Sequence, residues 1–68
     1  MSRYTISKDG FTAIAIWEAD QSKLTIYTSD GEKIGEFTKK ENANPNINYE
    51  SQLMEYLRKD GYVIMPFS

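Results

Sequence analysis

The sequence predicts an α+β fold, in which a four-stranded antiparallel β-meander is followed by one C-terminal helix on one face and a short fifth strand (ββββαβ). Three observations lead to this prediction. Asp-Gly pairs separate segments rich in β-branched and aromatic residues, a later segment has apolar residues at helical spacing, and a short apolar run follows it. With 68 residues and no internal repeat, the chain is expected to form one small globular domain over residues 1–68.

Polar turn signals divide the first half of the chain into strands. Asp9-Gly10 and Asp30-Gly31 suit the two-residue type I′ hairpin, because glycine adopts a positive φ at no steric cost. A third polar turn lies between them at residues 19–22. The expected strands are therefore residues 3–7, 11–18, 23–28 and 33–38.

A helix is expected over about residues 48–60, after an Asn-rich loop at residues 39–48. Asn48 or Asn46 can cap its first turn, and Gly61 suits the position after its last turn. Four apolar residues at spacings i, i+4, i+7 and i+8 form one stripe along this helix: Tyr49, Leu53, Tyr56 and Leu57.

The final apolar run, residues 62–67, predicts a short strand with Pro66 near its end, as is typical of a sheet edge. The helix returns the chain so that this strand runs antiparallel to the first strand when it docks beside it. Docking beside the fourth strand would instead make a parallel pair and require a right-handed crossover. We expect the first arrangement, with the strand order 5-1-2-3-4.

Counting outward from the three hairpin tips, with the middle tip at Asp20-Gln21, assigns every strand residue to one of two faces. The registers that follow from the three tips agree on the same two faces. The expected cross-strand pairs are Ile6–Ala13, Tyr4–Ala15, Thr5–Ile14, Trp17–Leu24, Ala15–Ile26, Ile14–Tyr27, Glu18–Lys23, Tyr27–Ile34, Thr25–Glu36 and Leu24–Phe37.

One face of the predicted sheet is the more apolar, and its two alanines leave room for a helix to approach. We call it the core face and expect the helical stripe to cover it. Its expected residues are Tyr4, Ile6, Phe11, Ala13, Ala15, Trp17, Leu24, Ile26 and Phe37.

The opposite face, which we call the open face, also carries apolar residues but has no second helix to cover it. One interpretation is an ordinary antiparallel sheet face that is half in contact with water. The other is an interaction site, which contiguous apolar patches usually mark. We favour the second interpretation, and the candidate protein-interaction residues are Ile14, Ile16, Tyr27 and Ile34.

Composition excludes several kinds of chemistry. The chain has no Cys and no His, which excludes disulfides, thiolate and imidazole metal ligands, and thiol or imidazole catalysis. A chain of this size is near the lower limit at which a hydrophobic core is stable alone. Without disulfides or Cys and His metal ligands, association with another subunit is the remaining means of added stability. Its eight basic and ten acidic residues give a net charge of −2, which argues against binding of duplex DNA.

The sequence does not favour an enzyme. Carboxylate pairs such as Glu18 with Asp20, or Asp30 with Glu32, could in principle act as general acid and base, but they fall at hairpin tips, where solvated turn residues are the expected interpretation. The segment SDGEKIG, residues 29–35, lacks the glycine spacing of phosphate-binding loops. We therefore infer no cofactor, no metal site and no small-molecule substrate.

The function expected from the sequence is a small non-catalytic module that binds protein through its open face, with another protein or a second copy of the chain as partner. The alternative is binding of single-stranded nucleic acid on an open β-sheet. We disfavour it because acidic residues balance the basic residues, so the chain offers no net positive field. Its candidate stacking residues would be Tyr4, Trp17, Tyr27 and Tyr62. We expect a cytoplasmic protein, because no segment resembles an export signal or a membrane span. The composition suits a small bacterial or phage-encoded protein.

Overall fold

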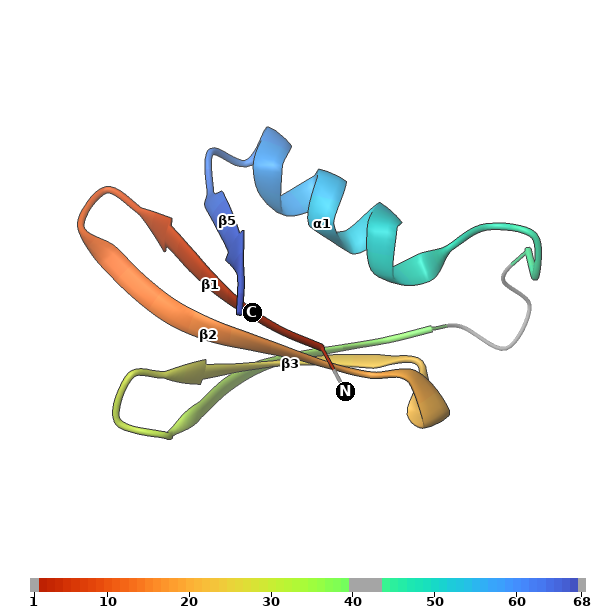
Figure 1. Ribbon diagram of the computed structural model, residues 1–68, viewed down its shortest axis with the longest axis horizontal. Helices are drawn as coiled ribbons and strands as arrows, with labels where there is room; N and C mark the ends of the chain where they lie inside the picture. Colours follow the sequence, from red (N-terminus) through yellow and green to blue (C-terminus); the bar gives the residue numbers. More distant parts are fainter. Residues whose placement is uncertain (1, 40–43, 68) are drawn as a thin grey trace.

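A computed structural model, which describes residues 2–39 and 44–67, has the predicted ββββαβ arrangement. The strands form one antiparallel sheet, and the α-helix of the described residues lies across one face of it (Figure 1). Residues 40–43, which belong to the predicted loop, lie outside the described residues. The elements are β1 (Ser2–Lys8), β2 (Phe11–Glu18), the 3₁₀ turn η1 (Ala19–Gln21), β3 (Lys23–Thr28), β4 (Lys33–Thr38), α1 (Tyr49–Lys59) and β5 (Val63–Pro66).

The order of the strands in the sheet is β4-β3-β2-β1-β5, which confirms the predicted order. β5 runs antiparallel to β1, with Ile6 opposite Ile64 and Thr5 opposite Met65. Because α1 carries the chain back along the sheet, the fifth strand reaches the free side of β1 without a parallel crossover (Figure 1). β4 and β5 are consequently the two edges.

The first two hairpins have the predicted register. Asp9 and Gly10 both have positive φ, at 51° and 82°, as the type I′ turn requires. The middle hairpin closes through η1 and a left-handed Ser22, a longer tip than the two residues we expected. The pairing Glu18–Lys23 is nevertheless the predicted one.

The third hairpin corrects one prediction. Only Gly31 has a positive φ, at 92°, and its N–H donates to the Thr28 carbonyl at 2.9 Å. The loop therefore follows the three-residue pattern, in which glycine comes last, and not the type I′ pattern. Tyr27 consequently lies opposite Lys33, so the predicted Tyr27–Ile34 pair is wrong.

The register shift at Ile34 restores the predicted pairing farther from the tip, where Thr25 lies opposite Glu36. As the extra residue in β4, Ile34 turns to the core face, where it lines a hollow together with Ile6 and Ile26. The predicted interaction residue Ile34 therefore does not lie on the open face.

The hydrophobic core lies between α1 and the core face of the sheet, as predicted. Ala13 and Ala15 have no exposed surface, so their small side chains let the helix approach closely. The rings of Trp17 and Tyr49 meet at a centroid distance of 6.0 Å. The buried apolar residues are Ile6, Ala13, Ala15, Trp17, Leu24, Ile26, Leu53 and Met54.

The rotation of α1 differs from the predicted stripe. Met54 is buried, whereas Tyr56 is 59% exposed. The Tyr4 hydroxyl donates a hydrogen bond of 2.6 Å to the Glu50 carboxylate, which fixes the side of the helix that carries Glu50 and Met54 against the sheet. Asn48 caps the first turn as predicted, since its side-chain oxygen accepts from the backbone N–H of Ser51 at 3.0 Å.

The bond between Tyr4 and Glu50 predicts a loss of stability at alkaline pH. It raises the pKa of Tyr4 above the ordinary 10.0, chiefly because the hydroxyl donates to the carboxylate and secondarily because it is partly buried. A pKa that is higher in the folded than in the unfolded chain gives stability that is complete below pH 10.0 and is lost as the pH rises through the folded value.

Titration of tyrosine absorbance and denaturant unfolding at pH 9 to 12, on the wild type and on Tyr4→Phe, test this expectation. The wild type should contain one tyrosine that ionises late and is missing from Tyr4→Phe. Its free energy of unfolding should fall more steeply above about pH 10 than that of the variant. A Tyr4 that ionises at or below the ordinary value would contradict the expectation.

Candidate functional site

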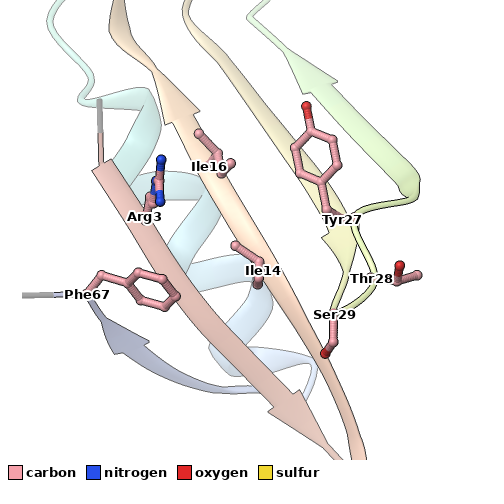
Figure 2. A pocket seen from close by; sticks show the side chains of 8 residues that line it. Arg3, Ile14, Ile16, Tyr27, Thr28, Ser29 and Phe67 are labelled. Atoms are coloured by element: carbon pink, nitrogen blue, oxygen red, sulfur yellow. The ribbon is translucent and has the colours of Figure 1, made fainter.

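The open face is the side of the sheet that faces away from α1, and its centre is apolar. Ile14 and Ile16 project from β2 and Tyr27 projects from β3, all on the side opposite the helix (Figure 2). Side chains alternate between the two faces along a strand, and the residues next to these three, such as Ala13, Ala15 and Ile26, are buried in the core. Three of the four predicted interaction residues are therefore brought together, and Ile34 is not.

These residues line a shallow groove of about 290 Å³. Ile14 and Ile16 form its floor between Tyr27 on one side and Arg3 with Phe67 on the other (Figure 2). The side chains on the floor are half-buried, and Phe67 is 47% exposed. The groove is wide, open and mostly apolar, which suits contact with a surface better than enclosure of a small molecule.

Arg3 and Phe67 are site residues that the predicted set of protein-interaction residues does not include. The backbone N–H of Phe67 donates to the Arg3 carbonyl at 2.9 Å, just beyond the paired part of β5. Counting the register of β5 against β1 would have identified them, because Thr5 lies opposite Met65. Within residues 2–39 and 44–67, the Arg3 guanidinium has no carboxylate within ion-pair distance.

The β5 side of the open face adds further apolar surface. Val63 and Met65 lie opposite Ser7 and Thr5 of β1, which places them on the open face. They are 61% and 64% exposed. The short polar side chains of β1 separate this apolar strip from the isoleucines of β2.

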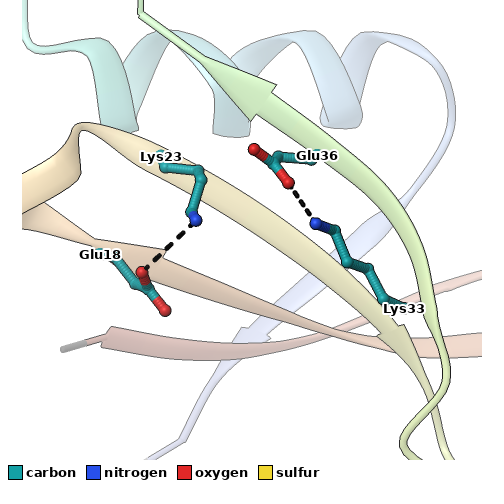
Figure 3. A network of polar contacts seen from close by, with 4 residues as sticks. All are labelled: Glu18, Lys23, Lys33 and Glu36. Carbon is teal, nitrogen blue, oxygen red and sulfur yellow. Dashed lines mark hydrogen bonds and ion pairs between the residues drawn. The ribbon is translucent and has the colours of Figure 1, made fainter.

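Two ion pairs occupy the other side of the open face. Lys23 of β3 lies 3.9 Å from Glu18 of β2, and Lys33 pairs with Glu36 within β4 (Figure 3). Thr25 is only 2% exposed although it lies on this face, since its cross-strand neighbours flank it. Acidic and basic groups thus neutralise each other beside β4. The charged residue that lines the groove is Arg3, at the border far from β4.

The pair within β4 shifts both partners in the direction that favours their charges. The hydrogen bond from Lys33 lowers the pKa of the Glu36 carboxyl below its ordinary range. The same bond, with the negative charge of Glu36, raises the pKa of Lys33. Both side chains are exposed to solvent, so the ion pair contributes little to the stability of the fold and mainly neutralises the two charges locally.

A second apolar hollow lies on the core face, between α1 and β4. The helix does not cover this flank of the sheet, and Phe11 and Phe37 are each 45% exposed although we expected them in the core. Phe37 and Leu57 line both parts of this hollow. The remaining aromatic residues around it are Phe11, Tyr49, Tyr56 and Tyr62.

The described part of the chain offers no group of three or more acidic side chains placed to hold a metal ion. Among the same residues, no helix has the length and apolar character needed to cross a bilayer. Comparison with known proteins gives no matching family model and no significant match to a curated protein or a solved structure. The site is therefore interpreted from its own geometry.

Replacing Lys33 with Met tests the charge arrangement beside β4. Without its hydrogen bond from Lys33, the Glu36 carboxyl should titrate at a higher pH than in the wild type, nearer the ordinary value. Carboxyl ¹³C chemical shifts measured against pH report this directly. Lys23→Met should raise the pKa of Glu36 less, because Lys23 contributes only a weaker charge effect. Equal shifts in both variants would contradict the assignment.

Proposed function

We propose that this chain is a small non-catalytic module that binds another protein through its open face. The observation that carries the proposal is the groove of Ile14, Ile16 and Tyr27 on the sheet face that α1 leaves uncovered. A strand that is apolar on both sides of a small sheet leaves one side to meet something outside the domain. Contiguous patches of this kind commonly mark interaction surfaces.

The chemistry of the groove defines the contact surface that would fit it. Isoleucine side chains on a flat sheet favour apolar side chains presented by a complementary surface. Tyr27 and Phe67 at its borders are residue types enriched where binding energy concentrates in interfaces. Arg3 adds a cation at one border, so the favoured partner presents an apolar centre with a carboxylate beside it.

Ile16→Lys tests the proposal at the centre of the groove. Ile16 is half-buried and its side chain faces away from the core, so the variant should remain folded. A lysine there would have to be buried without a partner in the complex, and binding should weaken by about 100-fold or more. The measurement is the affinity of purified variants for a partner captured from cell extract with the wild type.

Two variants serve as controls for Ile16→Lys. Ile47→Lys makes the same chemical change at an isoleucine that is 46% exposed before α1, and it should bind like the wild type. Ala15→Lys places the charge at a site with no exposed surface on the core face, and it should unfold the domain in a thermal melt. A partner that binds Ile16→Lys as tightly as Ile47→Lys would overturn the proposal.

One observation favours the alternative, single-stranded nucleic acid on the same face. Tyr27, Phe67 and Arg3 line one groove, and exposed aromatic rings with a nearby cation can stack bases and contact phosphate. The other candidate stacking residues lie in the core or pack against it: Tyr4, Trp17 and Tyr62. Titration with a labelled oligonucleotide at two salt concentrations decides: tight binding that salt weakens and Tyr27→Ala removes would support the alternative.

A further inference from the structure

The outer edge of β4 can accept another strand more readily than the other edge of the sheet. β5, at the opposite edge, is only four residues long and ends at Pro66, which has no backbone N–H to donate. β4 has six residues and lies beside the hollow that α1 leaves uncovered. An added strand would therefore find its partners along β4.

The backbone contacts of β4 show which of its groups point outward. The Lys39 N–H donates to the Ser22 carbonyl at 3.1 Å, so residue 39 is bonded toward β3. In an antiparallel ladder such residues alternate with residues whose N–H and C=O point away from the neighbouring strand. On the other side of the register shift, the Thr28 N–H donates to the Glu32 carbonyl at 2.8 Å. By this alternation, the residues whose backbone N–H and C=O point away from β3 are Lys33, Glu36 and Thr38.

The charges on β4 are complementary to those of an antiparallel copy of the same strand. Lys33 lies opposite Tyr27 and Glu36 lies opposite Thr25, so the two charged residues are two ladder positions apart on the open face. Gly35 occupies the position between them. A two-fold axis at Gly35 therefore places Lys33 of each copy opposite Glu36 of the other copy. Each of these facing pairs can exchange both backbone hydrogen bonds.

The core side of β4 also suits a second copy. Ile34 and Phe37 are 49% and 45% exposed there, beside the hollow next to α1. An axis perpendicular to the sheet keeps both helices on the same side, so the exposed Ile34 and Phe37 of the two copies would lie next to each other. Gly35 has no side chain at the axis, and within residues 2–39 and 44–67 a Cβ added there would meet only Ile26, at 3.8 Å, apart from its own chain neighbours. Two backbones can therefore approach closely.

We propose that β4 pairs with β4 of a second copy of this chain, antiparallel about Gly35, so that the two sheets become one. A lysine on an edge strand normally discourages pairing with other strands. Here the second copy brings a glutamate to each lysine by symmetry, whereas an unrelated strand would have to carry matching charges by chance. β4 therefore favours pairing with β4 of a second copy over pairing with an unrelated strand.

Charge exchange at Lys33 and Glu36 tests the pairing in solution by sedimentation equilibrium. The wild type should be a dimer at high concentration. Lys33→Glu and Glu36→Lys each bring like charges together twice about the axis, so each alone should dimerise at least about tenfold more weakly. An equimolar mixture of the two variants should form a heterodimer, because every acidic position then faces a basic one. The double variant should dimerise like the wild type.

Several results would overturn the pairing. One is a wild type that remains monomeric up to about 1 mM, where even weak association is visible. Another is single variants that dimerise as tightly as the wild type while remaining folded. Ile16→Lys separates this inference from the proposed function, since it alters the open face and leaves β4 unchanged. Loss of the dimer in Ile16→Lys but not in the charge variants would place self-association on the open face instead.

Discussion

The burial of Ala13 and Ala15 in one core cluster with Leu53 and Met54 of α1 is the constraint on which the rest of the structure depends. Both alanines have no exposed surface, and larger side chains there would push Leu53 and Met54 away from the sheet. By placing the helix on this face, the alanines decide which side of every strand becomes the core. Alternation then assigns the isoleucines of β2 to the opposite side, where no element of the described chain covers them.

One helix cannot cover a twisted five-stranded sheet, and the position of α1 determines what it leaves open. The Tyr4–Glu50 bond fixes the helix above β1, and the Tyr49 hydroxyl donates to the Thr38 carbonyl at 3.1 Å, beside the end of β4. Between these anchors the β4 flank stays uncovered, and Phe37 remains 45% exposed. Small domains have little interior relative to their surface. The apolar surface of this one is consequently divided between the core, the open face and the hollow next to β4.

The sequence was sufficient to predict the topology and most of the register, because tight turns fix pairing locally. It failed at Ile34, since Asp30-Gly31 is compatible with either a two-residue or a three-residue loop, and only the backbone φ angles distinguish them. It failed again on α1, where Tyr56, a member of the predicted stripe, is exposed and Met54, outside the stripe, is buried instead. A tertiary bond, from Tyr4 to Glu50, selects between them, and periodicity contains no information about it.

The two surfaces that we assign to partners are compatible with each other. The two-fold axis inferred at Gly35 is perpendicular to the sheet, so it would present the open faces of both copies on the same side. The charged side chains of Lys33 and Glu36 from both copies would then lie between the two grooves, near the axis. Each groove would keep its own Ile14, Ile16 and Tyr27 accessible. A partner with two matching sites would gain affinity from engaging both grooves, which a single small groove of this kind could not provide.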